Sequence, residues 1–371
     1  MNALDFRRLP KVLLHEHLDG GLRPKTVIEL AKDHDYLDLP TDDPDDLAAW
    51  FHRGAQRGSL PQYLEGFAHT IAVMQTRDAL VRVACEFLED MAADGVLYAE
   101  LRFAPVFHTA SGLTQDEVVR AVLDGLEYGE RKTGVSWGLI ICAMRDRTDS
   151  LEAAELAIRW RDHGVVGFDL AGGESGFPAK KHIDAFHAIQ RANFYITIHA
   201  GEAFGPESIW QALQWCGAHR LGHGTRLRKN IEVLPDGSLK LGTLAQYIMD
   251  RRVPLEMCLS SNIHTGACAT FEDHPFALFQ QAGFRVFLNT DDRLMSDTEM
   301  SKELEIATTT FDLSLPQLEK MTMDAMKSAF APHKTRIDLI QGLLLPSYAK
   351  LYEDLAERSL APPISRTTHH S

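Results

Sequence analysis

A His-Glu-His triplet stands near the start of the chain and brings His15 and His17 two residues apart. In a β-strand, residues with this spacing face the same side, so the two imidazoles would converge on one point. Such convergence suits a divalent metal ion. With 17 histidines in 371 residues, about one such spacing is expected by chance, so this pair needs support from elsewhere.

Three further motifs add candidate side chains. His199 lies in ITIHAGE with Glu202 three residues later, His223 lies in LGHG, and Asp291 and Asp292 lie in FLNTDD. Each residue taken singly could be a satisfied core histidine or a helix-capping carboxylate. Buried together without a metal, they would be costly unsatisfied groups. Their combination therefore predicts a metal site.

The elements that must position these residues follow a regular alternation of short apolar runs and longer amphipathic runs, which is typical of βα units. Amphipathic helices are expected at 78–93 and 114–132, the first followed by Gly95 as a stop signal. The expected strands are 11–17, 96–104, 136–144, 165–171, 194–200, 220–223, 254–260 and 285–291. Eight strands are the number that a closed (β/α)8 TIM barrel of the α/β class requires, although periodicity alone leaves an open doubly wound sheet possible.

The barrel is expected to form a single domain over 1–356. Extra helices are expected after the first strand, within 22–76, and again over 299–356. Residues 357–371 are polar and contain proline, which predicts a flexible tail. His369 and His370 lie in this tail and are interpreted as tail residues, without a metal-binding role.

Composition narrows the range of partners and of cellular locations. A net charge of -14 argues against binding to nucleic acid through phosphate contacts and against docking on an anionic membrane. The five cysteines are widely spaced and form no CxxC pair, which indicates reduced thiols. No segment has the length or hydrophobicity of a signal peptide or a transmembrane helix, so a cytoplasmic protein is expected.

The segments HEHLDGGLRP, FDLAGGE, TIHAGE, RLGHG and LNTDD occur in this order and resemble the adenosine deaminase family (adenosine/AMP deaminases) of the amidohydrolase superfamily. The similarity covers roughly residues 10–330. It implies one zinc ion per chain, with Glu202 as proton donor to the purine ring and His223 as the group that orients the attacking water. The zinc ligands that it implies are His15, His17, His199 and Asp291.

The same resemblance implies a set of substrate contacts. Asp292 would bind the purine N7, the backbone of Gly172 would bind N3, and Asp19 would bind the ribose 5′-hydroxyl. A hydrophobic gate over the purine is implied for one helical face, for which plain core packing is the alternative. That face consists of Leu60, Tyr63 and Leu64.

The implied reaction is hydrolytic deamination of adenosine, and of 2′-deoxyadenosine, to inosine or deoxyinosine and ammonia. It needs hydroxide at neutral pH for attack on purine C6, which zinc supplies by lowering the pKa of water to about 7. The attack places electrons on N1, which Glu202 is placed to protonate. No PCxxC motif is present, so the cytidine-deaminase fold is excluded. The predicted fourth strand ends without a lysine until Lys180, which favours one metal over two.

Two alternatives remain open from the sequence. Related enzymes act on adenine, adenosine phosphates or aminofutalosine, but a carboxylate at Asp19 favours a hydroxyl over a phosphate. A non-catalytic relative is the other alternative, although such a protein should have lost Glu202, His223 or Asp292. Ser260 and Ser261 could hydrogen-bond site residues or form a turn. Two residues depart from the family's common pattern, and they are Gly173 and Arg293.

Overall fold

The computed structural model describes residues 4–360. Within this range, eight parallel strands form one sheet in the neighbour order β1-β2-β3-β4-β5-β6-β9-β10. These strands are β1 (Lys11–His17), β2 (Val96–Phe103), β3 (Ser136–Met144), β4 (Val165–Ala171), β5 (Tyr195–Ala200), β6 (Arg220–His223), β9 (Leu255–Met257) and β10 (Val286–Leu288). A parallel bridge between Glu16 and Asp291 joins the first strand to the segment after the last, so the predicted (β/α)8 barrel is confirmed.

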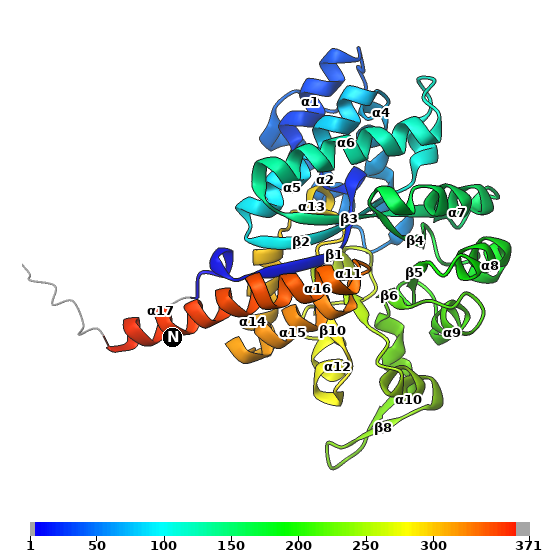
Figure 1. Ribbon diagram of the computed structural model, residues 1–371. Helices are drawn as coiled ribbons and strands as arrows, with labels where there is room; N and C mark the ends of the chain where they lie inside the picture. The colour runs from blue at the N-terminus through cyan, green and yellow to red at the C-terminus, as the bar shows by residue number, and fades with distance from the viewer. Residues whose placement is uncertain (1–3, 361–371) are drawn as a thin grey trace, which may run out of the picture.

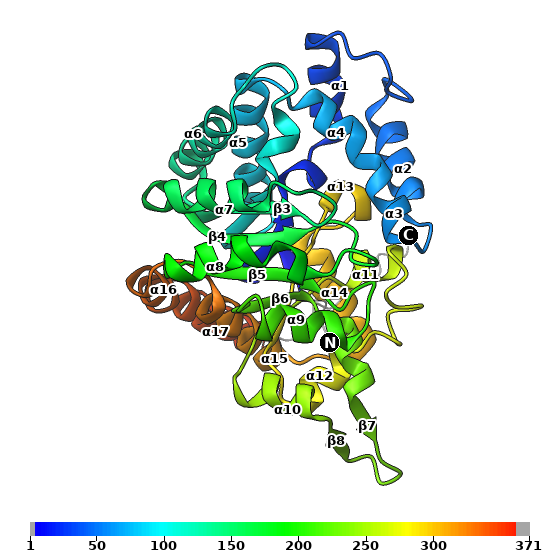
Figure 2. The ribbon, with the colours of Figure 1, turned by 90° about the vertical axis from the view of Figure 1, so that its right-hand side faces the viewer.

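Helices surround the barrel because parallel neighbours need long crossovers and because both faces of their strands are buried. Figures 1 and 2 show the strands at the centre with helices around them. The helices that follow successive strands are α5 (Arg77–Ala93), α6 (Gln115–Thr133), α7 (Ser150–Arg159), α8 (Ile183–Arg191), α9 (Pro206–Gln214), α10 (Thr243–Asp250) and α12 (Phe276–Ala282). The helix α6 starts at a Thr114–Glu117 capping box and ends at Gly134, whose φ is 77°. Both helices expected at 78–93 and 114–132 are confirmed.

Extra helices occur in both regions where the sequence predicts them. Between β1 and β2 lie α1 (Pro24–Asp33), α2 (Pro44–Ala55), α3 (Leu60–Tyr63) and α4 (Phe67–Val73), and α1, α2 and α4 gather at one end of the molecule in Figures 1 and 2. After β10 come α13 (Arg293–Ser296), α14 (Met300–Phe311), α15 (Leu315–Ser328), α16 (His333–Leu339) and α17 (Leu345–Leu360). The helix α17 thus extends past position 357, where the tail was expected to start, and His369 and His370 lie outside the described residues.

The last two barrel strands are shorter than the sequence suggests. The run 254–260 forms a strand only over β9, and α11 (Leu259–His264) begins directly after it, so Ser260 and Ser261 are helical. The run 285–291 forms a continuous ladder only over β10, and Asp291, whose φ is 66°, makes a single bridge with Glu16. A small antiparallel hairpin, β7 (Ile231–Val233) and β8 (Leu239–Leu241), was not predicted, and it protrudes from the barrel in Figure 2.

Apolar side chains fill the space between the strands and the surrounding helices. Among residues 4–360, no helix combines the length and the hydrophobicity that crossing a membrane requires. All five cysteines are free thiols, and four of them are buried.

Candidate active site

Three imidazole nitrogens and one carboxylate oxygen meet at the carboxyl ends of β1, β5 and β10. His15 Nε2 lies 3.0 Å from His199 Nε2 and 3.0 Å from Asp291 Oδ1. His17 Nε2 lies 3.1 Å from His199 Nε2 and 3.5 Å from Asp291 Oδ1. Atoms 3.0–3.5 Å apart can each lie about 2 Å from a shared centre, which is the length of a bond from zinc to nitrogen or oxygen.

The protonation of the histidines supports a cation at this centre. His15 Nδ1 lies 2.8 Å from Glu256 Oε2, and His199 Nδ1 lies 3.0 Å from Asp169 Oδ2. Because carboxylates accept hydrogen bonds, each Nδ1 carries the proton and each Nε2 presents a lone pair. Burial lowers the pKa of His199 to about 4, so its ring is neutral at physiological pH. Burial and Arg102 lower the pKa of His15, but Asp291 and Glu256 outweigh them and raise it, so without an ion its Nε2 can hold a proton. With both rings neutral, the two Nε2 lone pairs face one centre beside Asp291, and this donor set fits a divalent metal.

A buried arginine holds both supporting carboxylates. Arg102 donates to Asp169 Oδ2 at 3.0 Å and to Glu256 Oε2 at 2.9 Å, and all three residues are fully buried. Burial would raise the pKa of Asp169, but the neighbouring His199 and Arg102 outweigh it and lower this pKa. Sequence analysis missed Arg102 and Glu256. The available signal was a charged residue inside an otherwise apolar strand, where an unpaired charge would be very costly.

Glu202 and His223 lie beside the candidate metal-donor atoms. His223 Nε2 is 3.7 Å from Glu202 Oε2 and 3.9 Å from Asp291 Oδ2. Glu202 Oε1 accepts a hydrogen bond from Thr265 Oγ1 at 2.8 Å. Burial raises the pKa of Glu202, and the nearby His223 opposes this rise. A carboxyl group with a raised pKa is suited to carry a proton to a substrate.

A chain of hydrogen bonds sets the tautomer of His223. The backbone N–H of Phe276 donates to His274 Nδ1 at 3.1 Å, so His274 Nε2 carries the proton and donates to Asn262 Oδ1 at 3.1 Å. The Asn262 amide then donates from Nδ2 to His223 Nδ1 at 3.0 Å. His223 consequently bears its proton on Nε2, the nitrogen that faces Glu202 and Asp291. Sequence analysis did not identify Asn262 or His274.

Two of these site residues have a left-handed backbone. The φ angle is 62° at His223 and 66° at Asp291. A residue with a side chain adopts this conformation at a cost of about 1–3 kcal/mol, and such residues cluster at functional sites. His223 is the last residue of β6, and Asp291 lies three residues after the end of β10.

A cavity of about 450 Å³ opens above the donor atoms and contains every predicted substrate contact. It is lined by the candidate ligands His17, His199 and Asp291, by Glu202 and His223, and by Asp19, Leu60, Tyr63, Leu64, Gly172 and Asp292. The face formed by Leu60, Tyr63 and Leu64 is therefore part of the cavity wall. Tyr63 also belongs to the core, and Leu64 packs against it. Gly172 has a φ of 89°, which directs the chain around the cavity and is unfavourable for any other residue.

Polar groups without partners remain in this cavity. Tyr63 Oη donates to Asp292 Oδ2 at 3.0 Å, while Asp292 Oδ1 is buried with no hydrogen-bond partner among the described residues. Burial raises the pKa of Asp292 well above its usual value, and the negative charge of Asp291 adds to the effect. Burial also raises the pKa of Asp19 to about 7, and His108 Nε2 lies 4.0 Å from Asp19 Oδ2. These groups are positioned to meet polar atoms of a ligand.

Neighbouring loops hold the site residues in place. Glu174, in the loop after β4, accepts hydrogen bonds from the backbone N–H groups of residues 201–204 at 2.6–3.0 Å. Ser261 Oγ donates to Asp291 Oδ2 at 2.6 Å, so the supporting role considered for this residue is correct. Arg293 binds Glu16 Oε1 at 2.8 Å and Asp90 Oδ2 at 2.9 Å, so this departure from the family pattern fastens the end of β1.

A (β/α)8 barrel with a His/Asp cluster at the carboxyl ends of its strands belongs to the class of metal-dependent hydrolases of the amidohydrolase type. The family model described as adenosine deaminase matches residues 10–344. The chain belongs to the adenosine deaminase family.

Curated relatives and solved structures agree with this assignment. The chain is 54% identical over 351 residues to adenosine deaminase 1 of Streptomyces coelicolor, covering 93% of this chain and 89% of the relative. It is 50% identical to the adenosine deaminase of Mycobacteroides abscessus, covering 95% and 98%. Adenine deaminase of Arthrobacter aurescens has a similar structure, with a TM-score of 0.81, 25% identity, and coverage of 93% of this chain and 99% of that one. An Arabidopsis N6-mAMP deaminase aligns with a TM-score of 0.76, 26% identity, and coverage of 90% and 97%.

Proposed function

We propose that this chain hydrolyses adenosine, and also 2′-deoxyadenosine, to the inosine product and ammonia, using one zinc ion. The observation that carries the proposal is the convergence of four metal-donor atoms on one wall of a cavity that also contains Glu202 and His223. Curated relatives that are 50% and 54% identical to this chain over nearly its whole length are adenosine deaminases, which supports the substrate.

His15, His17, His199 and Asp291 would hold the zinc ion. Three imidazole nitrogens and one carboxylate favour zinc over magnesium or calcium, which prefer sets of oxygen ligands. When bound, zinc lowers the pKa of water to about 7 and so supplies a nucleophile at neutral pH.

The remaining residues bind and protonate the purine. Glu202 would protonate N1 as C6 is attacked, because its buried carboxyl group holds a proton more tightly than usual. His223, with its proton on Nε2, would donate to the attacking water and orient it. Asp292 would bind N7 through its unpartnered Oδ1, Gly172 would bind N3, and Asp19 would take the 5′-hydroxyl.

The wall formed by Leu60, Tyr63 and Leu64 would cover the purine and exclude water. Its apolar carbon surface suits an aromatic base, and the cavity has the size of pockets that bind small molecules. Tyr63 differs from the two leucines, because its hydroxyl is fixed to Asp292 and to Ser296. In this proposal Tyr63 positions Asp292, while the leucines contact the base.

Phosphorylated substrates are the second possibility, since the Arabidopsis relative of known structure acts on N6-mAMP. The buried Asp19 argues against them here. The ionised form of Asp19 would repel a phosphate, whereas both its ionised and its protonated form can hydrogen-bond a hydroxyl.

The substrate is thus a small purine nucleoside, and we place the enzyme in the cytoplasm. Free thiols persist in a reducing compartment, and this chain has five of them.

The deciding experiment is a substrate panel on purified protein with measured zinc content. Adenosine and 2′-deoxyadenosine are expected to be converted, with the ultraviolet change of inosine formation and about one zinc per chain. Adenine and adenosine 5′-phosphate are expected to react at least about 100-fold less efficiently. Zinc-loaded protein that leaves adenosine unchanged while deaminating another 6-aminopurine would overturn the substrate assignment.

A further inference from the structure

A second cavity of about 380 Å³ lies at the opposite end of the barrel from the metal-binding atoms. Tyr195 and Arg220 are the first residues of β5 and β6, and Pro254 and Arg285 directly precede β9 and β10. All four line this cavity, so it opens at the amino-terminal end of the strands. Active sites of (β/α)8 barrels lie at the other end, and the catalytic site therefore does not account for it.

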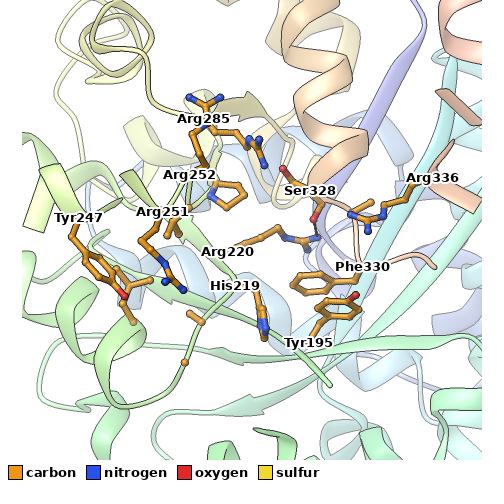
Figure 3. A pocket seen from close by; sticks show the side chains of 16 residues that line it. Tyr195, His219, Arg220, Tyr247, Arg251, Arg252, Arg285, Ser328, Phe330 and Arg336 are labelled. Carbon is orange, nitrogen blue, oxygen red and sulfur yellow. Dashed lines mark hydrogen bonds between the residues drawn. The ribbon is translucent and has the colours of Figure 1, made fainter. Parts of the chain in front are cut away.

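The lining of this cavity is strongly cationic. Five of its sixteen residues are arginines and none is an aspartate or a glutamate, although the whole chain has a net charge of -14. Figure 3 shows these side chains around the hollow. The positive charges of these arginines repel one another, and a bound anion would offset this repulsion. The arginines are Arg220, Arg251, Arg252, Arg285 and Arg336.

Internal carboxylates neutralise only one of the five arginines. Arg220 is buried and lies 2.7 Å from Glu100 Oε2 and 2.5 Å from Glu256 Oε1. Among the side chains of residues 4–356, no carboxylate oxygen lies within 4.0 Å of the other four. Asp324 is the acidic residue whose charge acts on the pKa of Arg285. Its carboxylate is already paired with Lys320, at 2.6 Å.

Two of these arginines also have buried nitrogens without acceptors. The Nε atoms of Arg285 and Arg336 are inaccessible to solvent and have no hydrogen-bond partner among the described residues. An unsatisfied buried donor is unfavourable, and each such donor is a position where an acceptor is missing. His219 supplies a further donor, because its Nδ1 accepts the backbone N–H of Ile196 at 3.1 Å and its proton therefore lies on Nε2.

An aromatic wall completes the cavity. The rings of Phe330 and Tyr195 are stacked with centroids 4.9 Å apart, and the Arg220 guanidinium lies 3.6 Å from the centroid of Phe330. Figure 3 shows this stack beside His219. The stack fixes Arg220, so the floor of the cavity is rigid, while Arg251 and Arg252 are exposed at its rim.

We propose that this arginine pocket, formed by Arg251, Arg252, Arg285 and Arg336 over the floor of Arg220 and Phe330, binds a small phosphorylated anion. Guanidinium groups match the oxygens of a phosphate in pairs, which makes arginine the residue best suited to its recognition. The volume lies within the range of pockets that hold small molecules. The phosphate could be inorganic or part of a sugar phosphate, and the two sources are separated by experiment.

The test is isothermal titration of the full-length, zinc-loaded protein at constant ionic strength. Inorganic phosphate and ribose 5-phosphate are the probes, and uncharged ribose is the control ligand. We expect one phosphate-bearing probe to bind per chain, and ribose to give no heat. Tighter binding of ribose 5-phosphate than of phosphate identifies a sugar phosphate, and equal affinity identifies the phosphate group alone.

Variants localise the binding. Arg251→Gln combined with Arg285→Gln is expected to weaken the affinity at least about tenfold, since each removes a charged hydrogen-bond donor. Arg53→Gln is the matched control, because Arg53 is exposed on α2, far from α10 in both ribbon views. Unchanged binding by the double variant, an equal loss in Arg53→Gln, or no binding by the wild type would each overturn the proposal.

Unfolding temperatures without anion show whether the variants are folded, and Arg252→Gln gives a second test at an exposed position. The result does not depend on deaminase activity, so the two proposals fail or succeed separately.

Discussion

Glu256 Oε2 accepts a hydrogen bond from His15 Nδ1 at 2.8 Å, on the side of the imidazole opposite to its metal-binding nitrogen. The contact fixes both the tautomer and the orientation of the ring. It also connects the metal site to the centre of the barrel, because Glu256 is bound by Arg102 and by Arg220. Glu256, which is not itself a proposed metal ligand, thus orients His15, which is one.

Replacing this carboxylate tests that relationship. Glu256→Gln is expected to lower zinc affinity about 10- to 100-fold, as measured by competition with a chelator. It should also destabilise the fold by about 3–5 kcal/mol, because buried arginines lose a charged partner. Glu232→Gln, at an exposed position of the hairpin, should change neither quantity. Normal zinc affinity in a folded Glu256→Gln protein would contradict the assignment.

Glu202 is expected to act in proton transfer without holding the metal. Glu202→Gln should retain zinc and lower kcat by about 10²- to 10⁴-fold, because an amide cannot protonate N1. The exposed Glu207→Gln provides a control five residues away on the same side of the barrel. Loss of zinc from Glu202→Gln, or nearly normal turnover, would show that the residue has another role.

Tyr63 is expected to act through Asp292. Tyr63→Phe keeps the aromatic wall but removes the hydroxyl that lies 3.0 Å from Asp292 Oδ2 and 2.9 Å from Ser296 Oγ. A lost hydrogen bond of about 1 kcal/mol corresponds to about a fivefold decrease in kcat/KM for adenosine. Zinc content should be unchanged, and the exposed Tyr128→Phe should behave as the wild type. Unaltered kinetics would mean that the hydroxyl does not position Asp292.

Removal of the metal is expected to affect stability as well as activity. Zinc binds the folded chain, so a free concentration 100-fold above Kd adds about 2.7 kcal/mol to the free energy of unfolding. A chelator should therefore lower Tm and abolish turnover, and zinc should restore both, whereas magnesium should not. His17→Ala should show a much smaller chelator effect. Identical Tm values with and without the chelator would contradict a metal held by these ligands.

Lys11 should give the stability a pH dependence at the other end of β1. Its Nζ is buried among carbonyl oxygens, and burial lowers its pKa from 10.5 to about 8. Between these values the unfolded chain holds a proton that the folded chain has released, so the free energy of unfolding rises with pH. The full effect is about 3 kcal/mol. Below about pH 8 both states are protonated and the dependence vanishes.

Denaturant titrations of the wild type and Lys11→Met measure this effect. The stability of the wild type relative to Lys11→Met should increase from pH 8 to pH 10, whereas the exposed Lys25→Met should show no such trend. A difference that stays constant over this range would show that Lys11 is not protonated differently in the two states.

The sequence contains most of the fold and the innermost part of the site, because these depend on local patterns. The His15–His17 spacing, the alternating apolar runs and the Asp291–Asp292 pair can each be identified within a few residues. The hairpin at 231–241 had an available signal as well, namely the Pro-Asp-Gly turn between two short alternating runs.

The surroundings of the site could not be predicted in the same way. Glu256 meets His15 across 241 positions of the chain, and Arg102 meets Glu256 across 154. Such pairings depend on how neighbouring strands align in the closed barrel, and no local pattern encodes that alignment. The contact between Ser261 and Asp291 is of the same kind, because it joins the helix after β9 to the segment after β10.

The bridge between Glu16 and Asp291 has a consequence for the dynamics of the barrel. The backbone N–H of His17 donates to Asp291 O at 2.8 Å, and the N–H of Asp291 donates to His15 O at 2.9 Å. The first and last strands are therefore joined at the same residues that we propose as metal ligands. A bound ion would hold together the two strands at this bridge, which lie about 275 residues apart in the sequence. In hydrogen-exchange experiments, the amides of His17 and Asp291 should lose protection before the rest of the barrel when the ion is withdrawn.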